Sequence, residues 1–202
     1  MPDITAAHVK QLRGETGAGM MDVKRALQDA DGDMDRAKQI LRERGLAGAK
    51  KFATRGAEEG LVEAYLHKPD PGAPAKVGVL VELNCATDFV ARTERFQTLA
   101  REVALHISFA DPLYVDRDSV PEDLVEKEIE IYRKQAEGKP ENVISKMVES
   151  KLNAFYAERC LLDQPYIRDD SKTVGQLLDE ATAELKEPVR VRRFARFRVG
   201  VE

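Results

Sequence analysis

The stretch KVGVLVELNCATDFVAR, residues 76–92, decides the fold because a strand pattern in it is followed by a helical one. Every second residue of its first half is apolar, which places these residues on one face of an extended strand. They are Val77, Val79, Val81 and Leu83. Residues 60–67 alternate similarly, and three prolines lie in the segment 68–75, so we predict a hairpin with a long loop. From Thr93 the apolar residues follow the period of a helix.

The remainder of the chain continues with helices and ends on a strand. Helical patterns are interrupted at Asp111-Pro112 and at Gly138-Lys-Pro140, with a capping box expected at 119–122 and a loop at 163–172. A last strand alternates from Val189 to Val199. Because strands and helices are segregated along the chain, we predict an α+β fold with a small antiparallel sheet covered by helices on one face.

The first 45 residues predict three short helices joined by tight turns. Thr5 and Asp33 are the expected N-caps of the first and third helices, and Gly45 is the expected end of the third. One apolar stripe is expected on the second helix: Met20, Val23, Leu27 and Ala30. The expected domains are a docking module at 1–45, a linker helix at 46–59 and an α+β core domain at 60–202.

The composition excludes several classes of protein. The 202 residues are 43% hydrophobic and 34% charged with a net charge of −4, which excludes wholesale disorder and a cationic field over the whole protein. No apolar run approaches the ~20 residues of a membrane helix, and the N-terminus lacks a secretory pattern. Cys85 and Cys160 form no CxxC motif, so we expect reduced core thiols in a cytoplasmic protein.

The motifs of catalysis and metal binding are missing from the sequence. The three histidines, His8, His67 and His106, are far apart and have no metal-ligand spacing. The glycines in residues 16–19 faintly resemble a phosphate loop, but they follow a helix, so a turn with positive φ is the better interpretation. We therefore expect neither an enzyme nor a metal or cofactor site.

Three features leave functional alternatives open. Five arginines in residues 190–198 either bind nucleic acid, as in a ribosome- or RNA-binding accessory protein, or keep an exposed strand face soluble. Met21 and Lys24 lie beside the apolar stripe and are either scatter or a contact surface. Residues 87–90 are either a helix start with Phe89 packed locally, or a rigid tip that places an aromatic wedge in a partner.

Three stretches resemble the elongation factor Ts family of bacterial translation. Residues 16–27, TGAGMMDVKRAL, and residues 82–92, ELNCATDFVAR, are similar to its two signatures. Residues 164–178, QPYIRDDSKTVGQLL, are similar to a further segment. Because the three occur in the order of the family and across most of the chain, the sequence is identified as a member.

The resemblance implies guanine-nucleotide exchange on elongation factor Tu. It implies that Thr87, Asp88, Phe89 and Val90 enter Tu near its Mg²⁺ and phosphate site. Phe89 would wedge between helices and Asp88 would make polar contacts, so that Mg²⁺ coordination is lost, GDP leaves and GTP can rebind.

The resemblance also implies how the rest of the chain contacts its partners. The N-terminal helices would form a bundle similar to ubiquitin-associated domains, with Met20, Met21 and Lys24 docking on Tu and a weaker contact from His67. The chain has room for one core half where longer members have two, so it resembles the short form, which works as a homodimer. Ala195 stands in the last strand, which has no cysteine, so a dimer through that strand would be non-covalent.

Overall fold

The computed structural model describes residues 4–16 and 18–200, apart from the side chains of residues 46–51 and 53. Gly17 of the expected turn and the outer ends of the first and last expected domains lie outside the described residues. The chain forms two compact units, each assembled from segments far apart in sequence. The first unit comprises Met1–Gly60, Asn84–Arg92 and Leu178–Arg190. The second unit comprises Leu61–Leu83, Thr93–Leu177 and Val191–Glu202.

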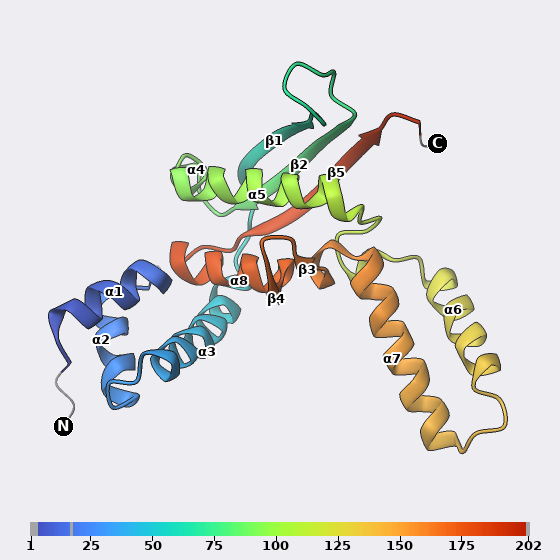
Figure 1. The fold of residues 1–202 in the computed structure, drawn as a ribbon, viewed down its shortest axis with the longest axis horizontal. Helices are drawn as coiled ribbons and strands as arrows, with labels where there is room; N and C mark the ends of the chain where they lie inside the picture. Colours follow the sequence, from blue (N-terminus) through green and yellow to red (C-terminus); the bar gives the residue numbers. More distant parts are fainter. Residues whose placement is uncertain (1–3, 17, 201–202) are drawn as a thin grey trace. The chain divides into compact units, whose positions relative to one another are not determined.

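Three helices in mutual contact open the first unit, as expected (Figure 1). They are α1 (Ala6–Thr16), α2 (Met20–Asp29) and α3 (Met34–Ala53). Thr5 accepts the amide of His8 at 3.3 Å, and Asp33 accepts two amides of the first turn of α3 at 2.9 Å. Both expected caps are therefore confirmed. The helices share a small apolar core: Leu12, Val23, Ala26, Leu27, Ala30, Ala37 and Leu41.

Two local expectations for this region are wrong. Helix α3 continues through Gly45 to Ala53, so Gly45 does not end it and residues 46–53 are part of the same helix. A methyl group on Gly45 would lie 3.7 Å from the side chain of Ala183 in α8 (Val174–Leu185), so packing supports the helix where local propensity predicted its end. Gly19 has φ −60° and needs no left-handed conformation, whereas Gly32 adopts one with φ 85°.

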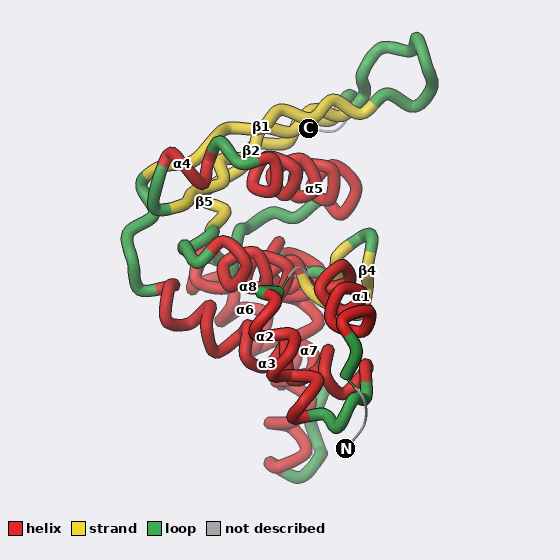
Figure 2. Tube along the Cα trace, turned by 90° about the vertical axis from the view of Figure 1, so that its left-hand side faces the viewer, coloured by secondary structure: helices red, strands yellow, loops and turns green. Residues whose placement is uncertain are grey.

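A three-stranded antiparallel sheet organises the second unit. Its strands are β1 (Glu59–His67), β2 (Val77–Cys85) and β5 (Arg190–Arg198), in the order β1-β2-β5. Helix α5 (Glu94–Ala110) runs along one side of the strands (Figure 2). The predicted apolar faces of β2 and α5 are both buried: Val77, Val79, Val81, Leu83, Phe96, Leu99, Ala100, Val103 and Ile107. The predicted α+β class is confirmed.

Two long helices form a hairpin in the second unit (Figure 1). They are α6 (Glu122–Gln135) and α7 (Glu141–Arg159), and neither contains a fully buried residue. The capping box expected at 119–122 is wrong, because Pro121 occupies the N-cap of α6. Ser119 instead ends a short 3₁₀ helix, η1 (Arg117–Ser119), and its amide donates to Asp116 at 2.8 Å.

A buried histidine joins the helices of the second unit to a small second sheet. The loop expected at 163–172 is wrong, because this segment begins at the end of η2 (Leu161–Asp163) and forms most of the antiparallel pair β3 (Pro165–Tyr166) and β4 (Asp169–Thr173). His106 Nε2 lies 2.9 Å from Gln164 Oε1, and its Nδ1 accepts the amide of Ile167 at 3.3 Å. The Gln164 amide donates to the carbonyls of Ala110 and Glu158. Burial lowers the pKa of His106, so the ring is held in its neutral form.

Candidate partner-binding site

The turn that follows β2 is stabilised from within. Thr87 has an extended backbone, and its hydroxyl oxygen accepts the amide of Val90 at 3.4 Å, which caps the four-residue helix α4 (Asp88–Ala91). The thiol of buried Cys85 donates to the carbonyl of Thr87 at 3.1 Å. The end of the strand and the start of the helix are thereby linked by hydrogen bonds.

The same turn is also held by a carboxylate that is 100 positions away in the sequence. Glu187 Oε2 accepts the backbone amide of Thr87 at 3.0 Å, and Glu187 Oε1 accepts its hydroxyl at 2.7 Å. Both residues belong to the first unit. Sequence analysis missed Glu187, because no local pattern connects a residue after the last helix to a turn after the second strand.

Phe89 projects from this held turn without packing against it. Its side chain is 80% exposed, whereas Ala91, on the opposite side of α4, is buried. The alternative in which Phe89 packs locally is therefore wrong. Asp88 forms an ion pair with Arg92 at 3.0 Å, and Val90 is half-buried. We call Thr87–Val90 the tip.

The N-terminal candidates share an exposed arc of α2. Met20 and Met21 are 57% and 60% exposed, and Lys24 is also exposed. At 3.6 residues per turn, these three positions span about 100° of the helix surface. Met20 was expected in the apolar stripe, which is wrong, because its side chain is 57% exposed whereas Val23 and Leu27 are buried in the core. We call Met20, Met21 and Lys24 the docking surface.

His67 belongs to the second unit, whereas the segments that carry the tip and the docking surface belong to the first. It is half-buried at the end of β1. Its ring meets Phe109 edge-on with centroids 4.8 Å apart, and its Nδ1 lies 3.4 Å from the Tyr65 hydroxyl. The ring is therefore part of an aromatic cluster on the edge strand, with part of its surface exposed.

At least two of the five arginines in the last strand make internal contacts. Arg196 is only 10% exposed, bonds the Ser108 carbonyl at 3.2 Å and pairs with Asp111 at 2.7 Å. It thereby occupies the C-terminal end of α5, where carbonyls lack helical partners. Arg193 pairs with Glu82 at 2.7 Å across the sheet. These contacts favour the interpretation of a charged strand in a sheet over that of a nucleic-acid track.

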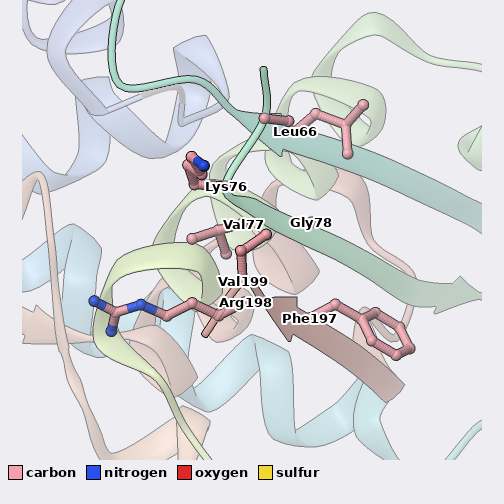
Figure 3. Close-up of a pocket in the computed structure, with 8 residues that line it drawn as sticks. Leu66, Lys76, Val77, Gly78, Phe197, Arg198 and Val199 are labelled. Carbon is pink, nitrogen blue, oxygen red and sulfur yellow. The ribbon is translucent and has the colours of Figure 1, made fainter. Parts of the chain in front are cut away.

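The sheet face opposite α5 exposes apolar side chains. We call it the outer face, and its large members are Val62, Leu66, Leu80, Phe197 and Val199. Figure 3 shows a hollow in this region, where Leu66 and Phe197 flank Gly78. A side chain at Gly78 would come within 3.3 Å of Leu66, so the glycine keeps the hollow open. The apolar face predicted for the last strand is therefore exposed at Phe197, which is 72% accessible.

The described residues offer little for catalysis. Among them, no three His, Cys, Asp or Glu side chains are grouped to hold a metal ion. Cys85 and Cys160 are both buried, and burial raises the pKa of each thiol, that of Cys160 to about 11, so neither is an activated thiolate. Within that same part of the chain, no helix combines the length and apolar character needed to cross a membrane.

Comparison with known proteins identifies the family. Residues 36–201 match the protein family described as Elongation factor TS. Elongation factor Ts of Frankia alni is 53% identical over 201 residues, which cover 98% of each chain. The protein of the same name from Caldanaerobacter subterraneus subsp. tengcongensis is 54% identical over 98% of this chain and 97% of its own. The match therefore includes the strand, the tip and the last helix, and the chain belongs to the elongation factor Ts family.

Proposed function

We propose that this chain binds elongation factor Tu in its GDP form and inserts the tip near the Mg²⁺ and phosphate site. The observation that carries the proposal is the 80% exposed ring of Phe89 on a turn held by Thr87 and Glu187. Members of the elongation factor Ts family are nucleotide exchange factors for elongation factor Tu and are not enzymes. Their action belongs in the cytoplasm, where bacterial translation takes place.

Exchange of this kind needs a difference in affinity and no catalytic side chain. A protein that binds nucleotide-free Tu more tightly than Tu with GDP must weaken GDP binding by the same factor. Burying one phenylalanine side chain is worth roughly 1.5–3 kcal/mol, about ten- to more than a hundredfold in an equilibrium constant. If Phe89 is buried only in the nucleotide-free complex, it supplies a substantial share of that factor. Disturbance of Mg²⁺ coordination adds to it.

The docking surface fits a first contact with the nucleotide-binding domain of Tu. Two exposed methionines offer adaptable apolar area, and Lys24 adds a charge beside them. Residues 1–45 act as the docking module in this proposal. His67 makes a second, weaker contact from the end of the hairpin.

We further propose that the working unit is a non-covalent homodimer formed through the outer face. Exposed apolar faces of this kind are sites of association, and a twofold axis would bring two identical faces together. The outer face includes Phe197 of the last strand and Val199 directly after it, and both are exposed. Glu82 of the central strand and Arg193 of the last strand are already paired within one chain, so the interface does not leave these charges without a partner.

The proposal is tested by the release of labelled GDP from purified Tu in the presence of excess unlabelled nucleotide. Adding this protein should accelerate release in a saturable manner, and added Mg²⁺ should reduce the acceleration. Release at the spontaneous rate with saturating protein would contradict the proposal. An affinity for RNA that falls steeply with salt, without accelerated release, would favour the RNA-binding alternative.

A further inference from the structure

We propose that Glu187 is the positioning residue of the tip: it holds Thr87 and so fixes the direction in which Phe89 is presented. This inference rests on the proposed function of the tip. Glu187 follows the last helix, 100 positions from Thr87, and acts through it.

The hydrogen bonds between the two residues match donor for acceptor. Thr87 offers two protons, on its backbone amide and its hydroxyl, and each is received by a different oxygen of the Glu187 carboxylate at 3.0 and 2.7 Å. An ionised carboxylate only accepts hydrogen bonds, so it suits a residue that presents two donors. The hydroxyl oxygen of Thr87 is then oriented to accept the amide of Val90.

This chain of bonds determines how α4 begins. The Thr87 hydroxyl cannot rotate without losing either the carboxylate or the Val90 amide. Since α4 has four residues, its direction depends on its cap rather than on its own length. Phe89 lies one position from Val90, so a change at the cap is carried to the ring.

Glu187 is itself held in place. Lys186 before it has a left-handed backbone with φ 58°, a conformation that non-glycine residues adopt at a cost. After it, Pro188 is buried with a restricted φ, and the amide of Val189 donates to Thr182 at 3.1 Å. A carboxylate on so constrained a turn can act as a fixed support.

The inference is tested with four proteins: wild type, Glu187→Gln, Phe89→Ala and the double variant. Glutamine has nearly the same shape, but it has one acceptor oxygen in place of two. Stimulated GDP release from Tu is measured over a range of protein concentrations, which separates the maximal rate from the half-saturating concentration. Circular dichroism identifies a temperature at which all four proteins are folded.

Glu187→Gln should lower the maximal rate by about tenfold, the low end of the loss for one hydrogen bond to a charged group, and change the half-saturating concentration less. In the Phe89→Ala background the same substitution should have almost no further effect, because the ring it positions is gone. Glu58→Gln, which removes the same charge from an exposed site of the first unit, should release GDP like wild type.

Three results would overturn the inference. Equal losses from Glu187→Gln with and without Phe89 would mean that the carboxylate acts independently of the ring. If Phe89→Ala slows stimulated GDP release but Glu187→Gln does not, Glu187 has no positioning role, and the proposed function of the tip stands. If Phe89→Ala exchanges like wild type, the proposed role of the tip fails and this inference fails with it.

Discussion

The tip and the outer face both expose apolar side chains, but they hold them in different ways. At the tip, one aromatic ring stands on a short helix whose cap is bonded to a carboxylate from a distant segment. On the outer face, five large apolar side chains are spread over three strands and the residue after the last one. A single aromatic side chain in a fixed position suits a narrow pocket in a folded partner, whereas a broad apolar face needs a partner surface that is also apolar and of similar area.

This difference separates two kinds of recognition within one chain. In the proposed function, the tip changes the state of the partner, because its binding energy is concentrated on one aromatic ring. In the proposed dimer, the outer face joins two molecules, because its binding energy grows with the area removed from water. Substitutions in one region should therefore leave the function of the other region measurable.

The largest effect is expected for a charge on the outer face. In a twofold dimer, Phe197→Asp would place two carboxylates in the interface, and burying an unpaired charge is costly. We expect the dimer dissociation constant to rise by more than about 100-fold, equivalent to about 3 kcal/mol. Light scattering and sedimentation at micromolar protein measure it.

Ser145→Asp, which adds the same charge at an exposed position of α7, is the matched control and should keep the assembly of wild type. A wild-type protein that is monomeric and fully active in GDP release would refute the proposed dimer.

A smaller effect is expected at the tip. Phe89→Ala should slow stimulated GDP release by roughly tenfold or more, in line with the loss of 1.5–3 kcal/mol of burial in the complex. Because the ring is 80% exposed in the free protein, the melting temperature should change little. Ile131→Ala, at an exposed position of α6, provides the control for loss of an apolar side chain. A large loss of thermal stability in Phe89→Ala would show that the ring supports the fold.

Much of the fold follows from local patterns in the sequence. The two periods in residues 76–107 predicted a strand, a helix and their buried faces, because burial on a regular element repeats at a fixed spacing. Thr5 and Asp33 were found for a similar reason, since a cap bonds within its own turn. The tip was also located, because Thr87 follows the end of the strand.

The remaining features depend on contacts between distant segments. Gly45 has the local signal of a helix end, but packing against Ala183 keeps α3 helical. Glu187 gave no signal, because its partner is 100 positions away. Arg196 was expected on a solvated face, yet the end of α5 encloses it. In each case the deciding neighbour belongs to another element.

A moderate effect is expected on the docking surface. Lys24→Glu reverses a charge beside the exposed methionines and should raise the half-saturating concentration about three- to tenfold, with little change in the maximal rate, because charges at an interface rim act mainly on association. The effect should shrink as salt is added. Lys10→Glu, an exposed lysine of α1, makes the same change elsewhere in the first unit. An equal loss in both variants would assign the effect to net charge instead of the docking surface.

The smallest effect is expected from pH, through one buried histidine. Burial lowers the pKa of His106 in the folded protein, so below the unfolded value of about 6.5 the unfolded chain binds more protons than the folded one. The contribution of neutral His106 to the free energy of unfolding should therefore be complete above that pH. It should decrease as the pH falls from about 6.5 towards the lower pKa of the folded protein, by at most about 1.4 kcal/mol per pH unit. Denaturant unfolding measured at several pH values between about 7.5 and 5.5, a range that brackets the reference pKa of histidine, gives this slope.

His106→Asn keeps an oxygen that can accept a hydrogen bond from the Ile167 amide, but it has no group that titrates in this range. This variant should be less stable than wild type at every pH, and its free energy of unfolding should no longer fall between pH values of about 7.5 and 5.5. His8→Asn, at an exposed position of α1, should keep it. An unchanged slope in His106→Asn would place the pH dependence elsewhere. His106 joins α5 to Gln164 and the second sheet, whereas the ring of Phe89 is exposed. If folded His106→Asn protein loses the pH dependence of its stability but still accelerates GDP release, the stability of the second unit and the action of the tip are separate properties.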